Sequence, residues 1–162
     1  MRTFLDCEFT QLNATAKLIS LALVAEDARK FYVELLDTWH PDDCSAFVKE
    51  IVLPQLWGGD HSCSILDACD RLLAFLRSFD CMITVVTDAP EYDWELFCEL
   101  AYNEGKWPQN VYPVPTNALT LEPLNDGSDL PHHALLDARI IAGMFASPDH
   151  RRVAERSTSG LR

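Results

Sequence analysis

Two carboxylates interrupt the apolar segment near the start of the chain, residues 4–10, which reads FLDCEFT. Phenylalanine, leucine, cysteine and threonine are typical of a buried β-strand, whereas acidic side chains are rarely buried unless a cation, a proton or hydrogen bonds compensate them. Residues i and i+2 of a strand face the same side, so Asp6 and Glu8 project together, away from their apolar neighbours. Their Cα atoms would lie about 6.6 Å apart, which suits carboxylates that reach toward shared divalent metal ions.

Acidic residues also occur within otherwise apolar patterns at two later positions in the sequence. The segment 87–97, TDAPEYDWELF, offers Asp88, Glu91 and Asp93 near the start of an expected helix, and we favour Asp93 as the residue that joins the first pair. The alternatives are that Asp88 or Glu91 takes this place, or that Asp93 only caps the helix. Asp137 lies within the last apolar helical pattern, where a solvated helix edge is the competing interpretation.

A histidine pair precedes Asp137 and supplies a candidate proton acceptor. His132 lies five residues before Asp137, so on a regular helix the two side chains would be about 140° apart. They converge only if His132 lies at a frayed helix start or in the loop before it, where it would be a mobile base. His133, four residues before Asp137, shares its helix face and is the alternative.

The pattern of the remaining sequence predicts an α/β fold, with a mixed sheet flanked by helices. An antiparallel three-strand meander is expected over residues 4–10, 17–27 and 29–37, and a strand covered on both faces over 81–88. Helices are expected over 41–56, 64–79, from 92–93 to Asn103 with Gly105 at the C′ position, and 132–145. One domain would span 1–146, including a long connection over 106–131, and a mobile tail would follow over 147–162.

The composition and charge of the chain limit which binding partners and which cellular compartment we expect for it. The 162 residues carry a net charge of −12, so a nucleic-acid partner would be gripped only at a short end, without the basic face that a long contact requires. The six cysteines form no C-x-x-C pair and lie in apolar patterns, which disfavours structural zinc. Residues 1–25 show no secretory signal and no apolar run could span a bilayer, so we expect reduced thiols, a cytoplasmic location and no membrane partner.

The segments FLDCEFT, EYDWELF and HHALLDA, in this order, resemble the motifs of the DEDDh 3′–5′ exonucleases, which have a ribonuclease H-like fold. The third motif, His-x-Ala-x-x-Asp-Ala, is the most specific, and His132, Ala134, Asp137 and Ala138 match it. The resemblance covers about residues 1–146, and the first 36 residues are most similar to small bacterial exoribonucleases of the polyadenylate-specific type. The chain lacks the glycine that follows the first motif in the wider family, and its middle section aligns poorly.

This resemblance implies a metal-dependent exoribonuclease that hydrolyses single-stranded RNA from its 3′ end as a homodimer. Two Mg²⁺ or Mn²⁺ ions would be held by the four motif carboxylates, Asp6, Glu8, Asp93 and Asp137. His132 would be the general base, and Phe9 and Thr10 would contact the terminal nucleotide. The oxygen-rich ligand set suits Mg²⁺ or Mn²⁺ better than zinc or iron.

Two other functions stay open at this point. The same chemistry on single-stranded DNA is one, because no residue in the sequence indicates a contact to a 2′-hydroxyl. A catalytically silent relative that serves as a binding module is the other, although all five motif residues are present. The four tryptophans are expected to pack in the core or at an interface rather than to stack on bases.

Overall fold

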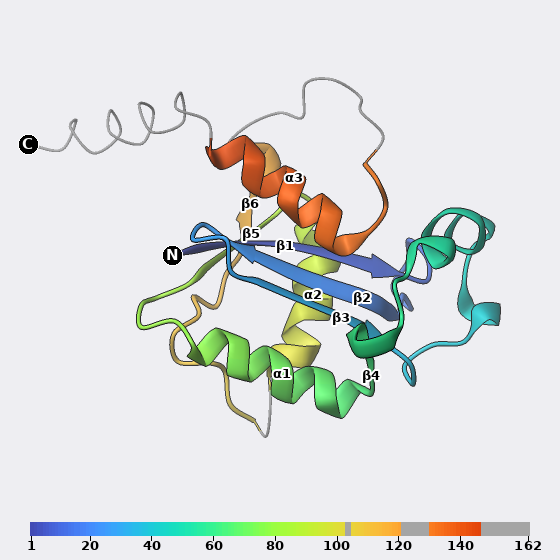
Figure 1. Ribbon diagram of the computed structural model, residues 1–162, viewed down its shortest axis with the longest axis horizontal. Helices are drawn as coiled ribbons and strands as arrows, with labels where there is room; N and C mark the ends of the chain where they lie inside the picture. Colours follow the sequence, from blue (N-terminus) through green and yellow to red (C-terminus); the bar gives the residue numbers. More distant parts are fainter. Residues whose placement is uncertain (103–104, 121–129, 147–162) are drawn as a thin grey trace, which may run out of the picture.

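Six strands form one mixed sheet in the computed structural model, which describes residues 1–102, 105–120 and 130–146 (Figure 1). In sheet order β4-β3-β2-β1-β5-β6, the strands are β4 (Ser62–Cys63), β3 (Lys30–Leu35), β2 (Leu18–Ala25), β1 (Arg2–Phe9), β5 (Thr84–Thr87) and β6 (Thr116–Asn117). The first three strands form the predicted antiparallel meander, and β5 is parallel to β1. The predicted α/β class and mixed sheet are confirmed, and the arrangement is consistent with a ribonuclease H-like fold. The tail expected over 147–162 lies outside the described residues.

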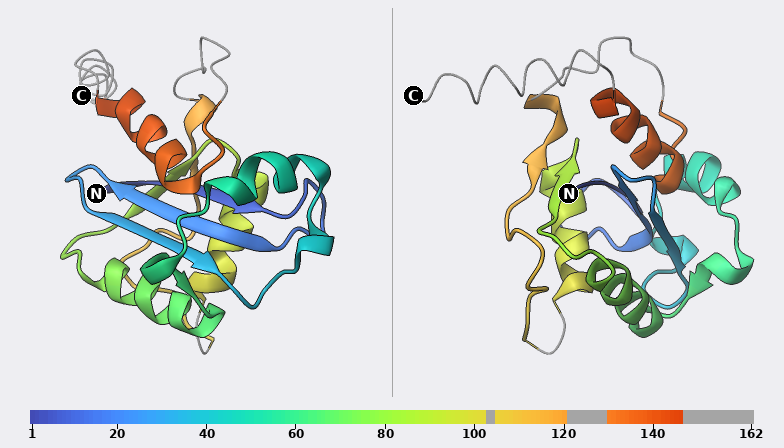
Figure 2. Two further views of the ribbon diagram at one scale, coloured as in Figure 1. Left: turned by 45° about the vertical axis from the view of Figure 1, so that its right-hand side comes forward. Right: turned by 60° about the vertical axis from the view of Figure 1, so that its left-hand side comes forward.

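Three α-helices cover the two faces of this sheet: α1 (Ile65–Arg77), α2 (Pro90–Ala101) and α3 (Ala134–Ala146). Helices α1 and α2 pack on one face, and α3 crosses β1 and β2 on the other (Figures 1 and 2). Helix α1 begins as predicted at Ser64, whose side chain accepts a hydrogen bond from the backbone N–H of Asp67.

The alternation of side chains along β1 determines which of them reach the α3 side of the sheet. Leu5 and Cys7 are buried in the core under α1 and α2, whereas Phe4 packs with Ile141 of α3. Asp6 and Glu8 share the side of Phe4, because alternate residues of a strand face the same way. The predicted common orientation of the two carboxylates is confirmed by their joint approach to Asp137 of α3.

The continuous helix predicted over 41–56 is wrong. The segment consists of a 3-10 turn, a π-helix and a second 3-10 turn, at Pro41–Asp43, Val48–Val52 and Leu53–Gln55. The helical pattern assigns Phe47, Val48 and Ile51 to the apolar face. Val48 is buried, as is Val52, but Phe47 and Ile51 are 50% and 40% exposed. A π-turn takes up more residues than an α-turn, so a period of 3.6 assigns the wrong residues to the buried face.

Several element ends also differ from the predictions. Helix α2 starts two residues early, at Pro90, because proline suits a first turn whose N–H groups need no partner. It ends at Ala101, so Gly105, which has a φ of 74°, is not its C′ residue. Strand β5 covers only Thr84–Thr87 of the apolar run, and α3 begins at Ala134, after both histidines.

The structure describes all six cysteines, and their thiols are unpaired. Within residues 1–102, 105–120 and 130–146, every helix is too short or too polar to cross a bilayer.

Two leucines of α1 provide a test of the core. Leu72 is fully buried between α1 and the sheet, whereas Leu66 on the same helix is 76% exposed. We expect Leu72→Ala to lower the free energy of unfolding by about 3 kcal/mol, because it removes buried methyl groups and leaves a cavity. Leu66→Ala should change it by less than about 0.5 kcal/mol. Urea unfolding of both variants checks this, and equal losses would place α1 in a different orientation.

Candidate active site

The site lies at β1, the strand that has the antiparallel β2 on one side and the parallel β5 on the other. β1 pairs with β2 along its length, but its register with β5 covers only Arg2 to Phe4. The carboxyl end of β1 therefore extends past this pairing, and Asp88 follows the end of β5 at the same edge of the sheet. Ligands commonly bind at the carboxyl ends of strands where the connectivity of a sheet reverses.

Five carboxylates gather at this edge in two overlapping groups. Asp6, Asp88 and Asp93 form one group, and Asp6, Glu8 and Asp137 form the other; within each, one oxygen per residue lies within 4.8 Å of the others. Asp6 belongs to both groups. The structure thus brings together all four carboxylates singled out in the sequence, and it adds Asp88, which the sequence offered only as an alternative to Asp93.

Two of these carboxylates lie in the first turns of helices. Asp93 is in the first turn of α2, and Asp137 is in the first turn of α3. The positive end of each helix dipole offsets part of the repulsion between the acids. Hydrogen bonds add to this, because the Thr87 hydroxyl donates to Asp93 and the backbone N–H of His133 donates to Asp137 Oδ2 at 3.1 Å.

Burial raises the pKa of every carboxyl group in the cluster, and repulsion by neighbouring carboxylates adds to this effect for all of them except Asp88. Burial is the largest cause for Asp6, whose pKa lies well above its usual value, and the nearby charges of Asp93 and Glu8 add to it. Burial, followed by neighbouring carboxylates, raises the pKa of Glu8 to about 8, and burial with Asp88 raises that of Asp93 to about 8. Burial also raises the pKa of Asp88 and of Asp137. Without a cation, Glu8 and Asp93 therefore retain protons near neutral pH.

This donor set fits hard divalent cations. Carboxylate oxygens are the ligands that Mg²⁺ and Mn²⁺ prefer in proteins. One oxygen of Asp137, Oδ1, is buried and has no hydrogen-bond partner among the described residues. A buried carboxylate oxygen without a partner is costly, and a cation shared with Asp6 and Glu8 would satisfy it.

His132 lies in the turn before α3, where it can approach Asp137. Its φ of 59° is in the left-handed region, which residues other than glycine rarely adopt. Burial is the main influence on the pKa of Asp137, and the nearby His132 opposes this effect. The imidazole of His132 contacts the Phe47 ring edge-on, with the ring centroids 4.9 Å apart.

His133 is buried in an aromatic cluster rather than placed at the carboxylates. Only 3% of it is exposed, and its ring packs against Tyr32 and Trp57 at centroid distances of 4.9 and 4.5 Å. Its Nδ1 accepts a hydrogen bond from the backbone N–H of Leu135, and burial lowers its pKa. These contacts make His133 a neutral residue that anchors the start of α3.

The two residues singled out for nucleotide contact follow Glu8 directly. Phe9 is half-buried, and its ring stacks on Tyr92 with the centroids 5.3 Å apart. Thr10 is fully buried, and its hydroxyl accepts a hydrogen bond from the backbone N–H of Lys17 at 3.1 Å. Phe9 thus connects the first motif to α2, while Thr10 closes the loop that follows β1.

The structure excludes one residue that the sequence offered for the site, and it adds two that the sequence did not indicate. Glu91, an alternative to Asp93, is exposed and faces a hollow with Asn13 and Glu95, outside both carboxylate groups. Conversely, Phe47 and Gln55 contact the turn that holds His132, although the helical pattern assigned their segment to the core. Local periodicity misses such contacts because they join residues far apart in the chain.

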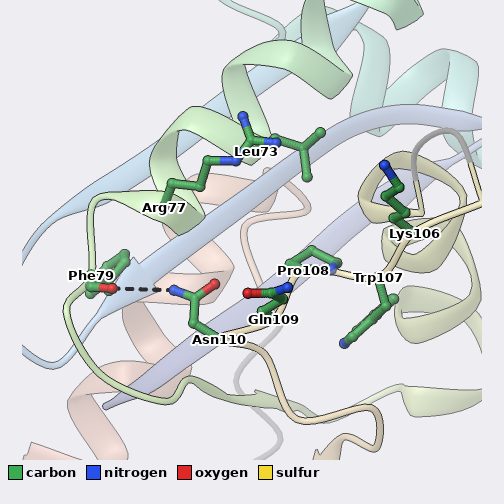
Figure 3. Close-up of a pocket in the computed structure, with 8 residues that line it drawn as sticks. All are labelled: Leu73, Arg77, Phe79, Lys106, Trp107, Pro108, Gln109 and Asn110. Atoms are coloured by element: carbon green, nitrogen blue, oxygen red, sulfur yellow. Dashed lines mark hydrogen bonds between the residues drawn. The ribbon is translucent and has the colours of Figure 1, made fainter.

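A hollow of about 650 Å³ lies away from the carboxylates, between the end of α1 and the loop 105–111 (Figure 3). Its loop pairs with the start of β5, since the backbone N–H of Ile83 donates to the carbonyl of Asn110, whereas Asp88 follows the end of that strand. Arg77 and Lys106 at its rim are separate from the carboxylate site, and this hollow is not part of it.

Comparison with known proteins gives a partial similarity. No family model matches the chain. Two proteins named 3′-5′ exoribonuclease, from two strains of Mycobacterium tuberculosis, are each 39% identical to it over 56 residues. The aligned segment covers 35% of this chain and 33% of the length of each relative. This chain is therefore similar over about a third of its length to proteins that carry the name of an RNA-degrading enzyme.

Proposed function

We propose that this chain is a metal-dependent 3′–5′ exoribonuclease of the DEDDh type, which hydrolyses phosphodiester bonds at the 3′ end of single-stranded RNA. The observation that carries the proposal is the pair of carboxylate groups that share Asp6 at the carboxyl end of β1. The partial similarity to proteins named 3′-5′ exoribonuclease supports the reaction class and the choice of RNA.

Two Mg²⁺ or Mn²⁺ ions would be held by the two carboxylate groups, which have Asp6 in common. Asp88 and Asp93 would complete one site, and Glu8 and Asp137 the other. When bound, such ions supply a nucleophile at neutral pH and stabilise the charge on the leaving oxygen. They would also offset the negative charge of the cluster, so that a phosphate group of the substrate can approach.

Two side chains would act on the substrate directly, and a third would position one of them. The imidazole of His132 would accept a proton from the attacking water, which its place outside α3 and near Asp137 allows. The half-buried ring of Phe9 offers a face to the terminal base, whereas Thr10, expected to contact the same nucleotide, is fully buried and would hold the loop that carries Phe9. With a net charge of −12, the protein would grip only the end of the RNA.

We further propose a cytoplasmic homodimer, as the resemblance of the first 36 residues implies. Light scattering at micromolar concentration tests the oligomeric state. A mass of about 37 kDa, twice the 18.3 kDa of one chain, is expected, and a mass of one chain contradicts the dimer.

The proposed function is tested with 5′-labelled single-stranded RNA and DNA of equal sequence, incubated with Mg²⁺, with Mn²⁺ or with EDTA. We expect a ladder that shortens from the 3′ end of the RNA and is lost with EDTA. Equal digestion of DNA would change the substrate class, and cleavage of neither strand under any metal condition would leave a binding module as the function.

Removal of the imidazole of His132 should impair the chemical step. We expect His132→Ala to lower kcat by about 10²- to 10³-fold, because general-base assistance is lost, with little change in Mg²⁺ affinity. His40→Ala, an exposed histidine on the turn Pro41–Asp43, is the matched control and should retain full activity. Single-turnover rates on short RNA measure both, and an unchanged rate for His132→Ala would assign the base elsewhere.

A further inference from the structure

One segment contacts three consecutive residues of the turn before α3. The Gln55 side chain donates hydrogen bonds from Nε2 to the carbonyl of Pro131 at 2.6 Å and to that of His132 at 3.4 Å. The Phe47 ring meets the His132 imidazole edge-on. Trp57 packs on His133. Residues 47–57, which lie beside the start of α3 in Figure 2, thus brace the turn from the side.

The bracing segment is itself well anchored. Val48 and Val52 are buried with Ile19 of β2 in a small core of their own. The carboxylate of Glu34, buried in β3, accepts hydrogen bonds from the backbone N–H groups of Trp57 and Gly58 at 2.7 and 2.9 Å. The segment is therefore attached to the sheet at both ends and can hold another element in place.

The turn needs such support. The left-handed φ of His132 is unfavourable for a non-glycine residue and persists only where the surroundings hold it. Gln55 Nε2 also donates to the carbonyl of Ile51 in the π-helix at 2.9 Å, so one amide group connects the π-helix to the turn. π-helical turns occur frequently at functional sites, and this one lies between Phe47 and Gln55, which both contact the turn that carries His132.

We propose that Gln55 is a positioning residue, which holds the turn Pro131–His132 so that the His132 imidazole stays beside the carboxylate cluster. This proposal rests on the proposed function of His132 as the general base. Loss of the amide donor should leave the carboxylates intact, because Gln55 contacts none of them, and should allow the imidazole to leave its place.

The test replaces Gln55 with methionine, which has a similar length and no hydrogen-bond donor. We expect kcat on short RNA to fall by 10- to 100-fold, while KM and the Mg²⁺ affinity change by less than about twofold. In a His132→Ala background, Gln55→Met should cause no further loss, because its effect passes through the imidazole. Gln109→Met, in the loop of the distant hollow, is the matched control and should resemble wild type.

Hydrogen exchange provides a readout that does not depend on activity. The backbone N–H of His133 and that of Asp137, which donates to the carbonyl of His133, should exchange at least 10-fold faster in Gln55→Met. The amide of Leu72 in α1 should keep its wild-type rate. Gln55→Glu, which keeps the shape and loses the donor, serves in the same way if Gln55→Met does not fold.

The possible results separate the two proposals. Unchanged exchange in the turn, or a further loss of kcat in the His132→Ala background, would overturn the role of Gln55 even if the protein degrades RNA. If the wild-type chain cleaves no nucleic acid, the proposed function fails on its own account, and the role of Gln55 in positioning a base fails with it; the exchange rates then report only whether Gln55 braces the turn.

Discussion

Replacement of Asp6 with asparagine is expected to abolish metal-dependent cleavage and, at the same time, to stabilise the metal-free protein. Asp6 is the one carboxylate common to both groups, so its loss removes a ligand from both proposed cation sites. We expect kcat to fall by at least about 10³-fold. Asparagine keeps the shape of aspartate and cannot ionise, so it removes an acidic group whose pKa is raised by burial and by the charges of Asp93, Glu8 and Asp137. In EDTA at pH 8.5, a gain of about 1–2 kcal/mol should raise Tm by about 3–6 °C.

These opposite signs distinguish a functional site from a structural one. If the carboxylate stabilised the fold, its removal would lower both the activity and the Tm of the protein. Asp70→Asn on the exposed side of α1 makes the same change of charge away from the cluster and should alter neither quantity. Cleavage assays and thermal melts of Asp6→Asn in EDTA and in Mg²⁺ measure the effect. A lower Tm for Asp6→Asn in EDTA would mean that hydrogen bonds, rather than cations, compensate the cluster.

The metal-free protein should lose stability as the pH rises from about 5 to about 8. The pKa of Glu8 rises from 4.5 to about 8 on folding, and that of Asp93 from 3.8 to about 8. Across this interval the folded protein binds protons that the unfolded chain has released, so the stabilising contribution is complete below about pH 4 and is lost as the pH passes through 8. One such proton is worth about 1.4 kcal/mol per pH unit, so we expect a loss of at least about 2 kcal/mol between pH 6 and pH 8.

Divalent cations should cancel this dependence, because they replace the protons on the carboxylates. Urea unfolding in EDTA at several pH values gives the slope, and 10 mM Mg²⁺ should stabilise the protein more at pH 8 than at pH 6. The double variant Glu8→Gln with Asp93→Asn should show a flatter profile in EDTA. A free energy of unfolding that stays constant from pH 6 to pH 8 in EDTA would show that the carboxyl groups titrate normally and are not buried together.

Much of the fold follows from local patterns in the chain. The apolar alternation of the first 36 residues is enough to predict the meander, and the helical spacing after Ser64 is enough to predict α1 and its cap. These predictions succeed because each element buries a face that its own residues define. The prediction for the segment 41–56 fails because this segment also contacts residues more than 75 positions away: Gln55 donates a hydrogen bond to Pro131, and the exposed Phe47 contacts His132.

The candidate site also has a part that the sequence predicts and a part that only the tertiary structure decides. The sequence is enough to predict the main candidate residues, because the proposed chemistry requires these residue types whatever surrounds them. They are Asp6 and Glu8, with their spacing, and the later Asp93, Asp137 and His132. Three features of the site cannot be predicted from the sequence, because each depends on where separate elements meet. They are the inclusion of Asp88, the burial of His133 away from the carboxylates and the support of the His132 turn by Gln55. A strand pattern dictates which way a side chain faces, but only the packing of β1 between β2, β5 and α3 brings five acids close enough to raise each other's pKa.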